Sequence, residues 1–195
     1  MYRLEQLMVL DIETVSSSKL FNDLPPIWQQ LWIEKYSKTT LAELSPEESY
    51  SQRAAITAEF GKVICITTGF FYTDADSKLH LKLKTVANDD EKILLNDFIN
   101  LCDRFRQKHN PFFFAGHNIK EFDIPYIARR MMHHKISLPD YFQLYGKRPW
   151  ETNLIDTLEL WKFGDYKNYT SLKLLSAFLG IPTSKDDMDG SMVGK

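Results

Sequence analysis

The order of the predicted elements indicates an α/β fold, a mixed β-sheet flanked by helices. Three strand patterns come early, at about 6–12, 62–72 and 79–86. Helices then alternate with strands as far as about residue 179. This order predicts one sheet whose faces are covered by helices.

The strand expected over 79–86 alternates leucine with charged residues, which is typical of a half-exposed strand at a sheet edge. These residues are Leu79, His80, Leu81, Lys82, Leu83 and Lys84. We expect Asn88 to cap the next element, a helix running to about residue 107. The buried stripe predicted for this helix consists of Leu94, Phe98, Leu101 and Phe105.

The second half of the chain predicts shorter elements. A fourth strand spans 112–115, and a helix begins at about residue 124. The pattern near 153–162 fits a strand or a helix, and the sequence leaves both open. The last predicted helix covers about 171–179 and ends at the glycine and proline that follow it.

Residues 16–58 form a predicted helical insertion after the first strand. A short amphipathic helix is indicated by Ile27, Trp28, Leu31 and Trp32. The run from Ser45 to Glu48 predicts a capping box that starts a second helix. The insertion either forms a flap over a substrate channel or covers an edge of the sheet, and we hold the two alternatives equal.

Composition is that of a soluble globular protein, with 44% hydrophobic and 26% charged residues over 195 positions. We expect a single domain over 1–195. No apolar run approaches the ~20 residues of a membrane span, and the start lacks the apolar core of a signal peptide. Cys65 and Cys102 are expected as reduced core residues. A cytoplasmic protein without a membrane partner follows, while a net charge of −2 neither favours nor excludes nucleic acid.

The run Met8–Thr14 carries two carboxylates, Asp11 and Glu13, among apolar residues. Side chains alternate faces along a strand, so both carboxylates point the same way. The apolar character predicts a central strand covered on both faces. Two carboxylates there would repel each other unless a divalent cation bound between them. The alternative is a strand that ends at Leu10, with both acids in a solvated turn or capping a helix.

A second polar segment, 116–123, follows the predicted strand at 112–115. We expect Asp123 to be the N-cap of the next helix and Pro125 to lie in its first turn. The apolar face of this helix is formed by Ile124, Ile127, Ala128 and Met131. Taken singly, Asp123 reads as a helix cap and Asn118 as a turn former.

In combination, Asp-Ile-Glu-Thr at 11–14 and His-Asn-x-x-x-Phe-Asp at 117–123 resemble the DEDD superfamily of 3′→5′ exonucleases. The resemblance is closest to the proofreading exonuclease domain of family B DNA polymerases, in the branch of stand-alone bacterial proteins predicted to be exonucleases. Stretches that agree are Glu59–Ile66, Asp156-Thr157, Thr170–Leu175 and Leu179–Pro182. The resemblance extends from residue 8 to about residue 190 and implies a ribonuclease H-like fold.

The resemblance also implies hydrolysis of phosphodiester bonds at nucleic-acid 3′ ends, with release of nucleoside 5′-monophosphates. Single-stranded DNA is the expected substrate, and two Mg²⁺ or Mn²⁺ ions are the expected cofactors. By this resemblance Asp11 would bridge both ions, Glu13 would hold the first and orient the terminal nucleotide, and Asp123 would serve the second. Asn118 would bind the substrate or hold its loop, and His117 is expected to be structural.

The family also requires a fourth carboxylate on a C-terminal helix, preceded by Tyr or His, and this element is missing. After Gly180 the acidic residues are Asp186, Asp187 and Asp189, in a polar stretch that reads as a loop. Asp156 falls too early to replace it. We expect the final helix to be absent from this chain and its activity to be low compared with that of a longer chain.

Other classes of function stay open beside the DNA exonuclease. One is an RNA exonuclease resembling oligoribonuclease on the same fold, and another is a non-catalytic module that binds nucleic acid. The basic residues 129–135 form either a rim for phosphates or a solvated helix end. Nearby aromatic residues either stack on bases or simply pack: Tyr141, Phe142, Tyr145 and Trp150. No pattern predicts the oligomeric state.

Overall fold

The computed structural model describes residues 3–39, 41–165, 167 and 169–182. It contains a five-stranded sheet in the order β3-β2-β1-β4-β5. The strands are β1 (Leu7–Ser16), β2 (Gly61–Thr73), β3 (Leu79–Ala87), β4 (Phe113–Gly116) and β5 (Leu154–Asp156). β1, β2 and β3 pair antiparallel, whereas β4 and β5 are parallel to β1. The predicted α/β class with a mixed, ribonuclease H-like sheet is therefore confirmed.

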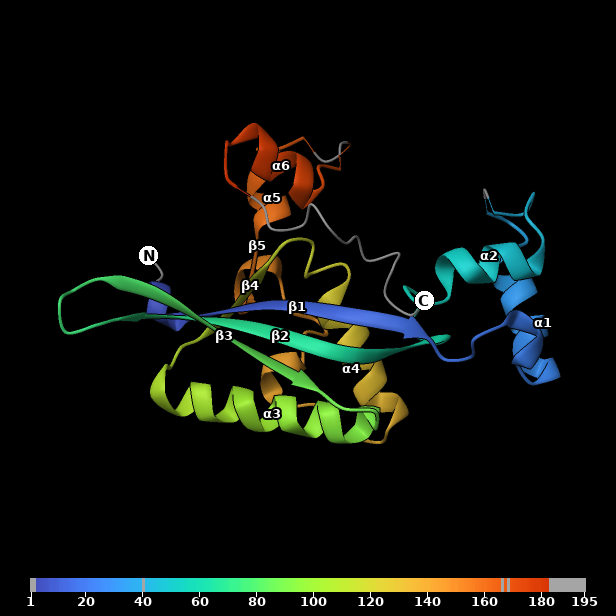
Figure 1. Ribbon diagram of the computed structural model, residues 1–195, viewed down its shortest axis with the longest axis horizontal. Helices are drawn as coiled ribbons and strands as arrows, with labels where there is room; N and C mark the ends of the chain where they lie inside the picture. The colour runs from blue at the N-terminus through green and yellow to red at the C-terminus, as the bar shows by residue number, and fades with distance from the viewer. Residues whose placement is uncertain (1–2, 40, 166, 168, 183–195) are drawn as a thin grey trace.

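Helices lie on both sides of this sheet (Figure 1). α3 (Glu91–Lys108) and α4 (Asp123–His133) pack on one face, and the short helices α5 (Thr157–Lys162) and α6 (Leu172–Phe178) stand on the other side. The main core lies between the sheet and α3 and α4. The stripe predicted for α3 is buried, since Leu94, Phe98 and Phe105 belong to this core and Leu101 is 8% exposed.

Strand β1 is central, and its two faces are buried to different extents, since Val9 and Glu13 on the second face are only half-buried. Met8, Leu10 and Ile12 are buried in the main core, whereas Asp11 between them is exposed. Within the described residues, the prediction of a strand covered on both faces is therefore confirmed for one face and only partly met on the other. The apolar residues of β1 alternate with Asp11 and Glu13, so a single packed face accounts for the pattern.

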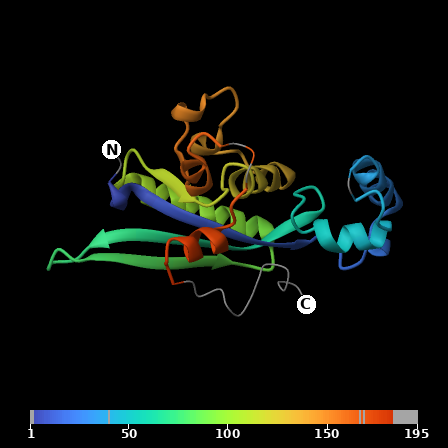
Figure 2. The ribbon, with the colours of Figure 1, turned by 90° about the horizontal axis from the view of Figure 1, so that it is seen from above.

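The insertion contains α1 (Pro26–Tyr36) and α2 (Pro46–Arg53), which lie beyond the C-terminal end of β1 in both views (Figures 1 and 2). The predicted capping box is confirmed, because the Ser45 hydroxyl accepts from the Glu48 N–H at 3.2 Å and the Glu48 carboxylate accepts from the Ser45 N–H at 3.0 Å. Trp32 is fully buried in a separate small core, together with Phe21, Leu24, Tyr50, Ala54 and Phe60.

The amphipathic stripe predicted for α1 is only partly correct. Of its four apolar residues, Trp32 is buried, whereas Ile27 is 58% exposed and Leu31 is 41% exposed. The helical spacing predicted the helix correctly. Of the four residues, however, only Trp32 is buried in the small core of the insertion.

Two helix starts differ by a few residues from the predictions. Asp90, not Asn88, caps α3, because its carboxylate accepts from the N–H groups of Lys92 and Ile93. Asp123 is the first residue of α4 and Phe122 occupies the cap position. Near 153–162, where the sequence fitted either a strand or a helix, the structure has both, since β5 is followed directly by α5. Shifts of one or two residues at helix ends are common, because the ends of helices fray.

The edge position predicted for the strand at 79–86 is confirmed, since β3 is the outermost strand of the described sheet and pairs with β2. Within the described ranges, no helix has the length and apolar character needed to cross a membrane.

Candidate active site

The two carboxylates of β1 point to the face of the sheet that α3 and α4 leave uncovered. Asp11 lies opposite Thr67 and Glu13 opposite Cys65 on β2. The register shifts between Glu13 and Thr14, so a bulge follows the second carboxylate. Bulges increase the local twist of a strand and re-aim its side chains, which is common beside functional sites.

The turn after β4 passes very close to β1. A Cβ added at Gly116 would lie 2.8 Å from the carbonyl oxygen of Leu10 and 2.3 Å from Ile119 Cγ2. Only glycine fits there without displacing the backbone. Asn118 then adopts a left-handed conformation with φ of 66°, which asparagine tolerates better than most residues.

Asp156, at the end of β5, holds this turn in place. Its Oδ1 accepts from the N–H groups of Asn118 at 2.8 Å and Leu158 at 2.9 Å, and its Oδ2 accepts from Lys120 N–H at 3.0 Å. The carboxylate thus caps α5 and fixes the turn at the same time. This positioning role was not predicted, although an Asp-Thr pair at a strand end is a signal for helix capping.

Asp123 is brought back to β1 by this turn. Its side chain is buried, and its Oδ1 accepts from the backbone N–H of Ile12 at 3.1 Å. The pairing of β4 with β1 covers Leu7–Val9 and ends before Ile12. The Asp123 carboxylate therefore accepts its hydrogen bond from a part of β1 that β4 does not pair with. Asp123 therefore contacts β1 between the two predicted carboxylates.

The electrostatics of Asp123 reflect this position. Burial, followed by the charge of Asp11 and a smaller contribution from Asp156, raises the pKa of Asp123 from 3.8 to about 7. A carboxyl group with this pKa is protonated about half of the time at neutral pH. Any cation that bound beside it would favour the ionised form.

Asn118 contributes an unpaired acceptor. Among the side-chain atoms of the described residues, its Oδ1 is the one that is buried without a hydrogen-bond partner. An unpaired buried acceptor costs free energy comparable to a lost hydrogen bond, so the atom is suited to receive a donor from a bound molecule.

The structure brings two of the three predicted metal ligands together. Asp11 and Asp123 are electrostatically coupled, and the Ile12 N–H links their segments. Within the described ranges, no group of three or more His, Cys, Asp or Glu side chains is arranged to hold a metal ion. Mg²⁺ usually retains several waters and is bound by one or two carboxylates together with substrate phosphates. The pair therefore fits such an ion. Asp186, Asp187 and Asp189, which the sequence analysis placed in a predicted loop, lie outside the described residues.

His117 has a structural role in the described fold. Its Nδ1 lies 3.0 Å from Thr157 Oγ1 and its Nε2 lies 2.8 Å from the carbonyl oxygen of Thr170. Both ring nitrogens are thereby engaged in joining the turn to α5 and to the start of α6.

The interpretation of residues 129–135 as a phosphate rim is wrong for two of its members. Arg130 is buried and donates from Nη2 to Glu91 Oε2 at 2.6 Å and from Nη1 to the carbonyl oxygen of Ala58 at 3.0 Å. His134 Nε2 lies 2.7 Å from Glu91 Oε2. Glu91 also accepts from the Val63 N–H at 2.7 Å, so this ionic group joins α3, α4 and β2. Of the four candidate stacking aromatics, Tyr141 and Phe142 belong to the core, and Tyr145 and Trp150 are exposed.

Comparisons with known proteins give a matching family model and similar solved structures. A sequence profile of the DNA polymerase family B exonuclease domain matches residues 6–173, a range that includes Asp11, Glu13, Asn118 and Asp123. No curated protein matches the chain. A family B DNA polymerase from the hyperthermophilic archaeon Pyrobaculum calidifontis is similar over 96% of this chain, with 13% identity and a TM-score of 0.46. The chain spans 20% of the length of that polymerase.

Proposed function

Because the chain belongs to the family of DNA polymerase family B exonuclease domains, we propose that it is a metal-dependent 3′→5′ exonuclease. Its substrate would be the 3′ end of single-stranded DNA, and its products would be nucleoside 5′-monophosphates. Mg²⁺ or Mn²⁺, as two ions, would be the cofactors.

The observation that carries this proposal is the buried Asp123 beside the charged Asp11. Burial and the neighbouring charge raise the pKa of Asp123 to about 7, so the protein without metal keeps an unfavourable acidic pair at this point. A divalent cation bound by both carboxylates would remove the repulsion and offset the burial of charge. Such ions activate a water for attack on a phosphodiester and stabilise the departing oxygen.

The chain's own residues would orient the reacting groups. The Ile12 N–H donates to one oxygen of Asp123 and would thereby hold the carboxylate in a fixed orientation. The Asn118 amide oxygen, held in place through its backbone bond to Asp156, would accept a hydrogen bond from the terminal nucleotide or from a water. Asp11 is exposed on the uncovered face, where a strand end can approach it. Glu13, two residues further along the same face, is the proposed third carboxylate.

The test is cleavage of 5′-labelled single-stranded DNA and RNA with Mg²⁺ or Mn²⁺, with EDTA as the metal-free control. The proposal predicts a ladder that shortens from the 3′ end and is lost with Asp123→Asn and with Asp11→Asn. Asp97→Asn, an exposed carboxylate on the opposite side of the sheet, is the matched control and should cleave like wild type. Preferential cleavage of RNA would show that RNA, rather than DNA, is the substrate. Binding of nucleic acid without metal-dependent cleavage would overturn the proposal that the chain is an exonuclease.

A further inference from the structure

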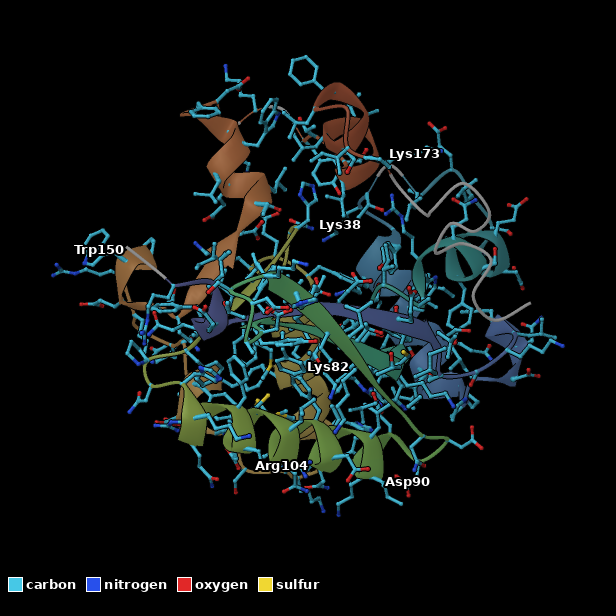
Figure 3. All side chains as sticks on the ribbon, turned by 60° about the vertical axis from the view of Figure 1, so that its left-hand side comes forward. Lys38, Lys82, Asp90, Arg104, Trp150 and Lys173 are labelled. Atoms are coloured by element: carbon cyan, nitrogen blue, oxygen red, sulfur yellow. The ribbon has the colours of Figure 1, made fainter. Side chains whose placement is uncertain are left out.

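A second candidate binding site lies on the side of the sheet away from Asp11. It is a pocket of about 460 Å³ between α3 and the strands β2 and β3. Its mouth carries three cationic side chains, Lys84 of β3 and Arg104 and Lys108 of α3. Figure 3 shows this side of the molecule, with Lys82 of β3 above Arg104 of α3.

The pocket has an unbalanced positive charge. No carboxylate lines it, and in the described part of the chain none of its three cations takes part in an ion pair. Arg104 donates from Nε to the carbonyl oxygen of Asn100 at 3.1 Å, and this is its one hydrogen bond to the described residues. The remaining guanidinium N–H groups are therefore available for a planar anion such as phosphate.

The floor of the same pocket is apolar and partly aromatic. It consists of the half-buried Phe70 in front of the buried Leu101 and Phe105, and the two phenyl rings lie 5.2 Å apart at an interplanar angle of 40°. A cationic mouth above an aromatic floor is the arrangement that proteins use for single-stranded nucleic acid, because phosphates meet cations while bases stack.

The strand register connects this pocket to the proposed active site. Asp11 lies opposite Thr67, and Thr67 lies opposite Thr85 on the edge strand β3. The hydroxyls of Thr67 and Thr85 are 3.1 Å apart, so this row follows the uncovered face as far as the edge. Neighbouring strands are about 4.8 Å apart, which places the edge about 10 Å from Asp11. Lys84, next to Thr85, points to the pocket side.

We propose that this basic pocket binds a nucleotide of a single-stranded substrate upstream of the 3′ end that lies at Asp11 and Asp123. The strand passes over the row of threonines and around the edge strand β3, with its phosphate between Lys84, Arg104 and Lys108 and its base against the half-buried ring of Phe70. The pocket thereby serves as a substrate-holding site distinct from the reacting centre. This proposal rests on the proposed function.

The test measures the affinity of labelled oligothymidylates by fluorescence anisotropy, in EDTA so that no cleavage occurs. The variant Arg104→Gln/Lys108→Gln removes two of the cations, and Lys78→Gln/Lys92→Gln, exposed lysines outside the pocket, is the matched control. Each phosphate contact on a single strand contributes about 0.7 to the salt exponent of binding. Loss of one contact should therefore lower the affinity about fivefold at 0.1 M salt. The pocket variant should therefore bind about 25-fold more weakly, with a salt exponent smaller by about 1.4.

A length series separates this site from the reacting centre. Affinity for wild type should rise in a step once the strand is long enough to pass the edge of β3, and the pocket variant should lack that step. Cleavage of the shortest oligonucleotides should be equal in both proteins. If wild type binds and cleaves nucleic acid but the pocket variant keeps the same affinity, salt exponent and length step, the pocket proposal fails and the proposed function stands.

Two other results would also overturn the pocket proposal. Competition by thymidine monophosphate without any length step would show a site for free nucleotides. Tight binding of polyglutamate at the pocket, with no oligonucleotide binding there, would show a site for acidic protein segments. If wild type neither binds nor cleaves nucleic acid, the proposed function itself fails.

Discussion

Asp123→Asn should make the metal-free protein more stable while abolishing cleavage. Asparagine keeps the size of the side chain and an oxygen that can accept from the Ile12 N–H, but it removes the charge. Each pKa unit corresponds to about 1.4 kcal/mol, so the difference between 3.8 and about 7 makes the ionised Asp123 cost about 4 kcal/mol of folding free energy. Burial of the asparagine amide costs about 1–2 kcal/mol. The expected net gain is therefore about 2–3 kcal/mol above pH 7.

The sign of the pH dependence follows from the raised pKa of Asp123. The folded state holds this proton more tightly than the unfolded state, so unfolding releases a proton at pH values between about 4 and 7. The protonated Asp123 therefore stabilises wild type relative to its ionised form. This stabilisation is complete below pH 4 and is lost as pH rises through about 7. The free energy of unfolding of Asp123→Asn minus that of wild type should therefore rise from pH 4 to pH 7 and then become constant.

Thermal and urea unfolding in EDTA measure this difference. At pH 8 the melting temperature of Asp123→Asn should exceed that of wild type by about 5–10 °C. Asp156→Asn is the matched control, because this equally buried aspartate accepts three backbone N–H bonds and its substitution should cost about 1–3 kcal/mol. A variant that is no more stable than wild type at pH 8, or a difference that does not change between pH 4 and pH 7, would refute the reasoning.

Three further predictions concern neighbouring residues. Glu91→Gln leaves the buried guanidinium of Arg130 without its counter-charge and should cost about 3–5 kcal/mol in urea unfolding, whereas a loss below about 1 kcal/mol would show that the pair is solvated. Asn118→Gly suits the φ of 66° and should leave the free energy of unfolding unchanged or higher by up to about 1 kcal/mol. It should slow cleavage about tenfold, because the amide oxygen is lost. Unchanged cleavage would show that Asn118 serves the turn alone. Asp11→Asn should lower the pKa of Asp123, measured by carbon NMR of its carboxyl group, and an unchanged pKa would contradict the coupling of the two carboxylates.

Local patterns predicted most of the sheet and helices because the information lay within a few residues. The alternation of leucine and charge in β3, the capping box of α2 and the apolar stripe of α3 depend on neighbours along the chain, and the structure confirms each. The alternation within β1 also gave the shared face of Asp11 and Glu13. It could not show whether a second layer covers that face, since covering depends on where distant helices pack.

Long-range contacts account for what the sequence did not predict. Arg130 looked like a surface cation because its partner, Glu91, lies 39 positions away, and only the packing of α4 on α3 brings them together. The anchoring of the Asn118 turn by Asp156 spans 38 positions and has no local signature beyond a capping aspartate. The basic pocket likewise joins β3 to the last turns of α3, and neither the sequence pattern of β3 nor that of α3 shows that the two lie together.

The central claim is that Asp11 and Asp123 hold a divalent cation together. It is tested most directly by anomalous diffraction from crystals of the protein soaked in Mn²⁺ at a concentration that supports cleavage. The account predicts a peak about 2.1 Å from a carboxylate oxygen of each residue. A peak elsewhere, with none between these two carboxylates, would contradict it.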